Sequence, residues 1–63
     1  MKIEITFDCD NAAFGQPDTE EFGHEVANIL REAAYKFEHG YATFPLRDSN
    51  GNTVGRASLT TGD

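Results

Sequence analysis

The fold of this protein is decided by residues 41–60, whose sequence is YATFPLRDSNGNTVGRASLT. Two stretches of alternating apolar residues flank the pair Asn50-Gly51. An Asn-Gly pair in that position is the strongest short-range indication of a β-hairpin. If Asn50-Gly51 forms a two-residue loop, Phe44 lies opposite Ala57, and the other apolar residues of both strands fall on the same face. The turn and the apolar pattern therefore predict one register. The further pairs in this register are Ala42 with Leu59 and Leu46 with Gly55.

Residues 2–8 predict a third strand. Ile3, Ile5 and Phe7 fall on one side of this segment, and polar residues fall on the other. Alternation with a period of two, in β-branched and aromatic residues, is typical of a half-buried strand.

Between the first strand and the hairpin, the apolar period becomes helical. Asp18 followed by Glu21 matches a capping box at the helix start, and Thr19 is an alternative cap. Gly40 is suited to end the helix, because glycine readily adopts the left-handed backbone conformation found there. The apolar stripe consists of Phe22, Val26, Ile29, Leu30, Ala33 and Phe37.

The fold class expected from these elements is α+β. Residues 1–63 are expected to form one small β-α-β-β domain, with one helix packed on one face of a three-stranded sheet. The strand order stays open: the first strand is parallel to the second if those two are neighbours, and antiparallel to the third if it pairs there. The expected core consists of Ile3, Ile5, Phe7, the six residues of the helical stripe, Ala42, Phe44, Leu46, Ala57 and Leu59.

The second face of the sheet is expected to be bare and to carry Tyr41, Arg47 and Arg56. Arginine and tyrosine are favoured at binding surfaces, so these residues are candidates for a dimer or partner surface. The alternative is a solvated face with cross-strand charge pairs. Most carboxylates are expected on the helix instead, which predicts an acidic partner-binding surface. Its residues are Glu20, Glu21, Glu25, Glu32 and Glu38.

Charge and length exclude several classes of function. Eleven acidic residues against five basic ones give a net charge of −6. This balance argues against bulk binding to nucleic acid or to anionic membranes, which both need positive surface. A chain of 63 residues buries one modest core, so stability from oligomerisation is expected, as a homodimer. The chain shows no transmembrane run, which predicts a cytoplasmic protein.

Catalytic and metal chemistry find little support in the sequence. The loop at residues 48–52 is superficially similar to a calcium loop. The calcium pattern needs glycine at its sixth position and glutamate at its twelfth. Here glycine is fourth and Leu59 is twelfth, so the hairpin is the preferred interpretation. Cys9, His24 and His39 are widely spaced, unlike the paired ligands of zinc sites. The two histidines are separated by more than about 20 Å along one helix, so they cannot share an ion within one chain. We therefore expect no enzyme activity, no metal and no cofactor.

Three segments together resemble a known group of proteins. They are the DNAAF segment at residues 10–14, the helix segment EVANILR at residues 25–31 and the hairpin segment LRDSNGNTVG at residues 46–55. The ensemble is similar to short, uncharacterised proteins encoded by tailed phages and prophages. The resemblance implies a setting of anti-defence proteins, among them anti-CRISPR-like inhibitors, and carries no catalytic residue.

The function expected from this resemblance is non-enzymatic inhibition of a host antiviral defence complex by protein–protein binding in the host cytoplasm. CRISPR effectors and helicase–nuclease complexes are the target classes. The acidic helix is expected to compete with nucleic acid for a basic cleft. The alternatives are a nucleic-acid-binding accessory protein that uses the open sheet face, and a small virion or assembly subunit.

Overall fold

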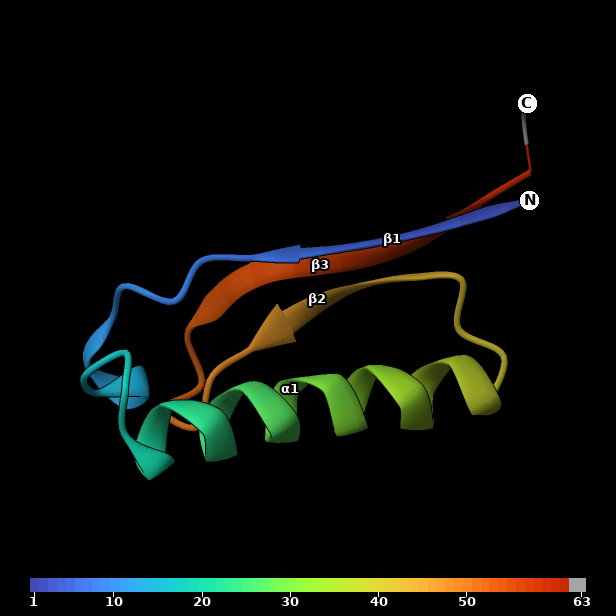
Figure 1. Ribbon diagram of the computed structural model, residues 1–63. Coiled ribbons are helices and arrows are strands. Elements are labelled where there is room, and N and C mark those ends of the chain that lie inside the picture. Colours follow the sequence, from blue (N-terminus) through green and yellow to red (C-terminus); the bar gives the residue numbers. More distant parts are fainter. Residues whose placement is uncertain (62–63) are drawn as a thin grey trace.

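The computed structural model describes residues 1–61 and contains a three-stranded sheet beside one long helix (Figure 1). This arrangement confirms the α+β fold class expected from the sequence. The elements, in chain order, are β1 (Lys2–Phe7), the short 3-10 helix η1 (Ala12–Phe14), α1 (Glu20–Glu38), β2 (Thr43–Arg47) and β3 (Thr53–Thr60).

The last strand lies in the middle of the sheet. The strand order is β1-β3-β2, and both pairings are antiparallel. Lys2 pairs with Thr60 at one end, which brings both ends of the described chain to the same side of the molecule (Figure 1). Of the two orders left open by the sequence, the structure therefore has the one in which β1 pairs with β3.

The hairpin loop between β2 and β3 holds three residues, not the two that were predicted. The Asp48 N–H donates to the carbonyl of Asn52 (2.9 Å), and the Gly51 N–H donates to the carbonyl of Asp48 (3.0 Å). Gly51 has a φ of 86°. Glycine adopts this left-handed conformation without steric cost, so the turn is closed by a glycine bulge.

A second irregularity restores the predicted register beyond the loop. Arg47 pairs with Thr53 but Leu46 pairs with Gly55, so β3 contains one extra residue, Val54, at this point. Phe44 then lies opposite Ala57, as predicted. The bulge also turns Val54 away from the open face, and its side chain packs against the core.

Helix α1 is terminated at both ends by identifiable contacts. The Thr19 side chain accepts a hydrogen bond from the N–H of Phe22 (3.3 Å), so Thr19 is the cap rather than Asp18. At the other end Gly40 has a φ of 91°, and the N–H of Tyr41 donates to the carbonyl of Lys36 (2.9 Å). These contacts satisfy backbone groups that the helix itself leaves free.

The core lies between α1 and the β2–β3 half of the sheet. Phe14, from the connection after β1, is fully buried, and its ring lies between those of Phe7 (6.4 Å) and Phe22 (6.0 Å). Phe14 thus joins the end of β1 to the start of α1. The buried apolar residues are Phe14, Ile29, Ala33, Phe44, Leu46 and Ala57.

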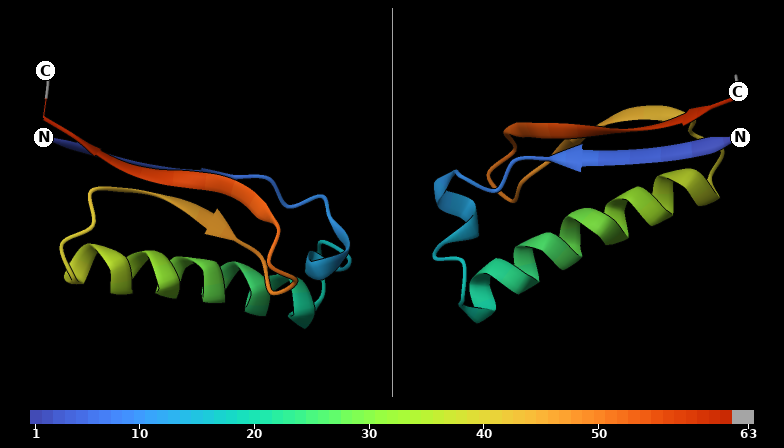
Figure 2. Two further views of the ribbon diagram at one scale, coloured as in Figure 1. Left: turned by 180° about the vertical axis from the view of Figure 1, so that it is seen from behind. Right: turned by 45° about the horizontal axis from the view of Figure 1, so that its top comes forward.

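The helix leaves β1 uncovered, which corrects part of the predicted core. Helix α1 runs along β2, whereas β1 is the far strand (Figures 1 and 2). Ile3 and Ile5 are consequently 55% and 37% exposed, and Leu30 on the helix is 44% exposed. Ala42 is also exposed, and Phe7, Phe22, Val26, Phe37 and Leu59 are only partly buried.

Gly55 permits the close pairing of β1 with β3. A Cβ atom at this position would overlap the carbonyl oxygen of Thr6 and would lie 2.5 Å from Cα of Phe7. Both are backbone atoms, which cannot move away without disturbing the pairing of β1 with β3. Gly23 is different, because a Cβ atom there would meet nothing within 4 Å.

These two glycines give a matched pair of substitutions. We expect Gly55→Ala to lower the free energy of unfolding by at least about 2 kcal/mol, because the methyl group overlaps fixed backbone. Gly23→Ala should instead raise it by about 0.5–1 kcal/mol, because alanine loses less conformational entropy in a helix. Urea denaturation followed by circular dichroism measures both. Equal stability of the two variants would contradict the close approach at Gly55.

Candidate functional site

The most highly connected polar group is the carboxylate of Asp48, which is buried at the start of the hairpin loop. It accepts hydrogen bonds from the N–H groups of Asn52 (2.8 Å) and Asn50 (3.0 Å). It also accepts one from the side-chain amide of Asn11 (2.6 Å), which precedes η1. One carboxylate therefore shapes the hairpin loop and attaches it to the β1–α1 connection. The sequence predicted a hairpin at this loop and argued against a calcium site, but it did not predict these contacts of Asp48.

The same hydrogen bonds set the ionisation of Asp48. Burial on its own would raise the pKa of the carboxyl, because it disfavours the charged form. The N–H of Asn52, the amide of Asn11 and the N–H of Asn50 outweigh this effect, since each stabilises the carboxylate. The net result is a pKa below the ordinary value of 3.8.

Glu25 attaches the helix to the hairpin loop. Its carboxylate accepts a hydrogen bond from the N–H of Ser49 (2.6 Å), and the residue is only 6% exposed. Glu25 was predicted to lie on the exposed acidic surface, and the structure corrects this placement. Helical periodicity could not reveal it, because the partner of Glu25 lies 24 residues further along the chain.

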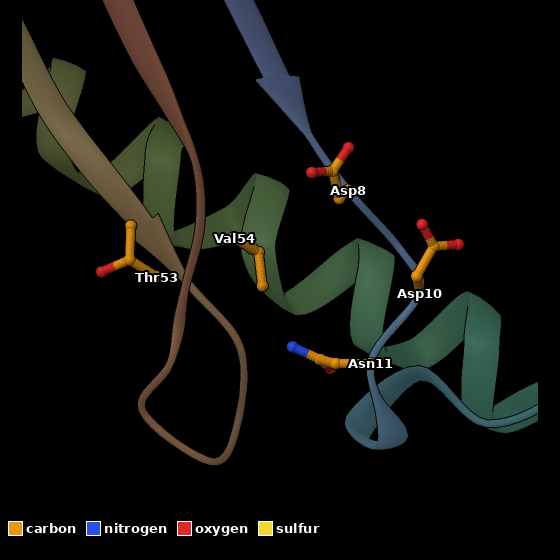
Figure 3. A pocket seen from close by; sticks show the side chains of 5 residues that line it. All are labelled: Asp8, Asp10, Asn11, Thr53 and Val54. Atoms are coloured by element: carbon orange, nitrogen blue, oxygen red, sulfur yellow. The ribbon is translucent and has the colours of Figure 1, made fainter.

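An open depression of about 300 Å³ lies where β1 ends beside the hairpin. It is lined by Asp8, Asp10, Asn11, Thr53 and Val54, and Figure 3 shows the two aspartates on the same stretch of chain after β1. Both aspartates are exposed, whereas the amide of Asn11 points toward the hairpin and is bonded to Asp48. The depression thus presents carboxylates to solvent.

This depression belongs to a larger acidic surface at one end of the molecule, which we call the acidic end. The chain has no lysine or arginine from residue 3 to residue 30. The end of β1, η1 and the start of α1 lie together at this end (Figure 1). The acidic end consists of Asp8, Asp10, Asp18, Glu20 and Glu21, all of which are exposed.

The other predicted glutamates of the helix lie apart from the acidic end. Glu20 and Glu21 begin α1, whereas Glu38 ends it, roughly 27 Å away at 1.5 Å per residue. Glu32 is exposed but forms an ion pair with Lys36 (3.7 Å). The five glutamates predicted as one surface are therefore divided: two lie at the acidic end, one is buried, and two lie further along the helix.

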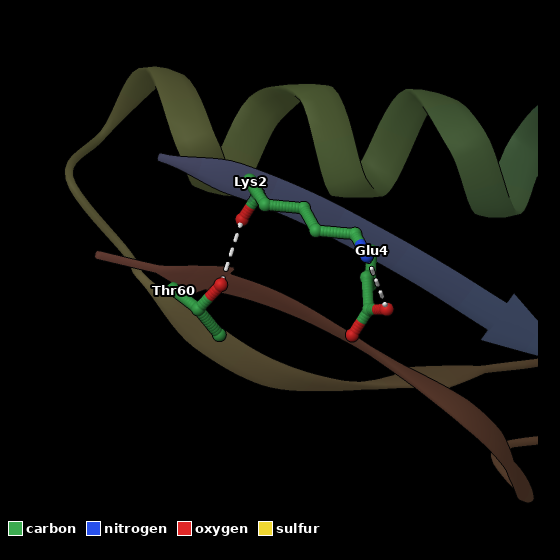
Figure 4. Close-up of polar contacts among 3 residues, drawn as sticks. All are labelled: Lys2, Glu4 and Thr60. Atoms are coloured by element: carbon green, nitrogen blue, oxygen red, sulfur yellow. Dashed lines mark hydrogen bonds and ion pairs between the residues drawn. The ribbon is translucent and has the colours of Figure 1, made fainter. Parts of the chain in front are cut away.

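The open face of the sheet carries separated charges of both signs. Lys2 and Glu4 form an ion pair along β1 (3.5 Å), and the hydroxyl of Thr60 donates to the carbonyl of Lys2 (Figure 4). Arg56 pairs across the sheet with Pro45 and Thr6. Within residues 1–61, neither Arg47 nor Arg56 forms an ion pair, and both are exposed.

Tyr41 lies away from the two arginines, which corrects the prediction that all three share the open face. Its ring packs edge-on against Phe44 (6.2 Å), a core residue that faces the helix. The ammonium group of Lys36 lies 5.8 Å from the ring centroid. The Schellman-type end of the helix places Tyr41 there before β2 begins, so the alternation of the strand does not extend to it.

Further chemistry was sought in the part of the chain that the structure describes. Among residues 1–61, no three histidine, cysteine, aspartate or glutamate side chains gather closely enough to hold a metal ion. In the same residues, no helix combines the length and apolar character needed to cross a membrane. Comparison of the chain with protein-family models, curated proteins and solved structures finds no match.

The lowered pKa of Asp48 predicts a specific acid sensitivity. The carboxylate stabilises the folded state above the ordinary pKa of 3.8, and this contribution is lost as the pH falls through the lower pKa of the folded state. We therefore expect Asp48→Asn to lower the melting temperature near neutral pH. A neutral amide would then face the N–H donors that the carboxylate accepts from, and it is a weaker acceptor than a carboxylate. Between about pH 5 and pH 2.5, the variant should lose less stability than the wild type. Parallel pH dependences of the two melting temperatures would contradict this assignment.

The buried contact of Glu25 predicts that the helix glutamates differ in their effect on stability. Glu25→Ala leaves the N–H of Ser49 without its acceptor and should cost about 1–3 kcal/mol of unfolding free energy. Glu38→Ala removes an exposed carboxylate of the same helix and should change it by less than about 0.5 kcal/mol. Urea denaturation of the two variants decides. Indistinguishable stabilities would show that the bond to Ser49 contributes nothing.

Proposed function

We propose that this protein is a non-enzymatic phage protein that inhibits a host antiviral defence complex by binding it in the host cytoplasm. The observation that carries the proposal is the acidic end, whose five exposed carboxylates come from a stretch of sequence that contains no lysine or arginine. Such a surface is complementary to the basic clefts with which CRISPR effectors and helicase–nuclease complexes hold nucleic acid. The protein would occupy such a cleft in competition with the nucleic acid.

The proposed contact surface has a defined shape because the core holds its segments together. Phe14 fixes the β1–α1 connection against Phe7 and Phe22, and Thr19 caps the helix. The carboxylates therefore lie on segments that are ordered before binding, which reduces the entropy lost on association. Clustered charge of one sign also accelerates encounter with an oppositely charged partner.

A binding role accounts for the carboxylates better than a catalytic one. Catalytic carboxyl groups are commonly buried beside a cleft, where their pKa is adjusted to the reaction. The buried carboxylates described here, Asp48 and Glu25, are both occupied by hydrogen bonds that hold the hairpin loop. The aspartates at the depression are exposed to solvent. These features support electrostatic recognition.

Charge neutralisation at the acidic end tests the proposal. We expect Asp10→Asn, Asp18→Asn and Glu20→Gln together to weaken inhibition strongly in plaque assays on defence-bearing hosts. The control, Glu32→Gln with Glu38→Gln, removes two carboxylates outside the acidic end and should retain most of the inhibition. Thermal melts of both variants verify folding. Unchanged phage protection by wild-type protein across a broad panel of defence systems would overturn the proposal.

The salt dependence of binding provides a second measurement. Once a target complex has been captured from infected cells, its affinity for the protein should fall steeply as ionic strength rises, because surface charges are screened over about 8 Å at physiological salt. The neutralised triple variant should show a shallower dependence. An affinity that does not change with salt would contradict recognition through the acidic end.

The exposed arginines favour one alternative, a nucleic-acid-binding accessory protein that uses the open sheet face. Arg47 and Arg56 both lie on this face, and neither is paired with a carboxylate within residues 1–61. A gel-shift experiment with single- and double-stranded nucleic acid distinguishes the two functions. Salt-sensitive binding at micromolar protein that is lost in Arg47→Ala and Arg56→Ala would favour the alternative.

A further inference from the structure

The two edges of the sheet differ in whether another strand can pair with them. In the pairing of β2 with β3, the N–H of Leu59 donates to the carbonyl of Ala42. The N–H and C=O groups of the even-numbered residues of β2 therefore point toward β3. The peptide groups of Thr43 and Pro45 consequently face the outer edge. Pro45 has no N–H to offer there. The β2 edge is therefore protected against further pairing.

The β1 edge has no such protection. The N–H of Asp8 donates to the carbonyl of Val54, and this bond continues the register of β1 with β3. The N–H and C=O groups of the even-numbered residues of β1 therefore point toward β3. The peptide groups of Ile3, Ile5 and Phe7 consequently face outward. No strand within residues 1–61 pairs with them, and β1 contains neither proline nor a bulge. An edge of this kind is a template for another strand.

Exposed apolar side chains border the same edge. Ile5 lies opposite Ala57, which lies opposite the buried Phe44, so Ile3 and Ile5 are on the face of the sheet that the helix partly covers. On α1, Glu25 contacts the hairpin loop and Lys36 contacts Tyr41. The flank of the helix that carries these two residues therefore lies on the β2 side. Leu30 follows Val26 by four residues on the other flank, toward β1. Ile3 and Ile5 on β1, and Leu30 on the flank of the helix toward β1, are therefore exposed apolar residues on this side of the molecule.

We propose that a second copy of this chain pairs antiparallel with β1, with Ile5 opposite Ile5 of the second copy. The two three-stranded sheets would join into one continuous sheet with twofold symmetry. This inference specifies the homodimer expected from the sequence, and it depends on the edge and its charges rather than on the proposed inhibitory function.

Charge and side-chain complementarity select this register. It places Lys2 opposite Asp8 of the second copy, twice by symmetry, and it places Glu4 opposite Thr6 of the second copy. On the apolar face, Ile3 lies opposite Phe7 of the second copy. Opposite charges and apolar pairs across neighbouring strands are both stabilising. The outward peptide groups of Ile3, Ile5 and Phe7 also all find partners.

The neighbouring registers are poorer. A slip of two residues in one direction places Glu4 opposite Glu4 of the second copy, and like charges directly opposite one another are destabilising. The register centred on Ile3 does pair Lys2 with Glu4 of the second copy, but it leaves Phe7 beyond the paired segment. A slip of one residue would turn the apolar residues against the polar face.

Light scattering over a range of protein concentrations tests the dimer. Wild-type protein should approach twice the chain mass of 6.9 kDa at the upper concentrations. Ile5→Lys should remain at the mass of one chain, because it places two ammonium groups together at the symmetry axis. Ile5 is 37% exposed in the isolated chain, so the substitution should leave the fold intact, which circular dichroism verifies.

A charge swap tests the register. Asp8→Lys alone places like charges opposite Lys2 at both symmetric positions and should weaken dimerisation about tenfold, which corresponds to about 1.4 kcal/mol. Lys2→Asp combined with Asp8→Lys restores opposite charges and should restore dimerisation. A wild-type mass of one chain at hundreds of micromolar would overturn the proposal. A dimer that is insensitive to Ile5→Lys, or a double variant no better than Asp8→Lys, would also overturn it.

These outcomes are separable from those of the inhibition assay. An inhibitor that is monomeric in solution would contradict the dimer alone. A dimeric protein that inhibits no defence system would contradict the proposed function alone.

Discussion

The fold depends on one buried carboxylate. Asp48 accepts hydrogen bonds from two N–H groups of the hairpin loop and from the side-chain amide of Asn11. The hairpin loop is thereby held to the segment that leads into η1, and Glu25 holds the same loop to the helix through Ser49. Three parts of the chain that are distant in sequence thus meet at one turn. Glu25, which was predicted on the acidic surface, is used in this way together with Asp48, because a buried N–H group without an acceptor is costly.

The position of this junction explains why the molecule is asymmetric. The helix is attached to the hairpin through Glu25 and packs along β2, so the core forms on that side of the sheet. β1 is fixed through its pairing with β3, which Gly55 allows at close range, and through Phe7 against Phe14. The helix packs along β2 rather than β1, so Ile3 and Ile5 are more exposed than the other apolar residues of the sheet. A small core and an open edge both follow from this placement of the helix.

The same asymmetry separates the surfaces that are available for binding. The acidic end combines the residues after β1 with the first turn of α1, whereas the arginines lie on the open face of the sheet. In the proposed dimer, antiparallel pairing through β1 places Lys2 of each chain beside Asp8 of the other. Asp8 is then paired within the dimer, and the other four carboxylates of each acidic end lie at opposite ends of it. A partner with two basic sites could then engage both ends, which would increase the avidity of binding.

The sequence by itself determined the elements, because their signals are local. Alternation predicted β1, the stripe from Phe22 to Phe37 predicted α1, and the Asn50-Gly51 pair with its flanking residues predicted the hairpin and the pairing of Phe44 with Ala57. The tertiary structure decided the strand order, the three-residue loop with its compensating bulge, and the burial of Glu25 and Asp48. It also decided that Tyr41 packs on the helix side and that Ile3 and Ile5 stay exposed. These features depend on contacts between residues far apart in the chain, such as Asn11 with Asp48. Periodicity shows which side of an element is apolar, but only the packed chain shows what covers that side.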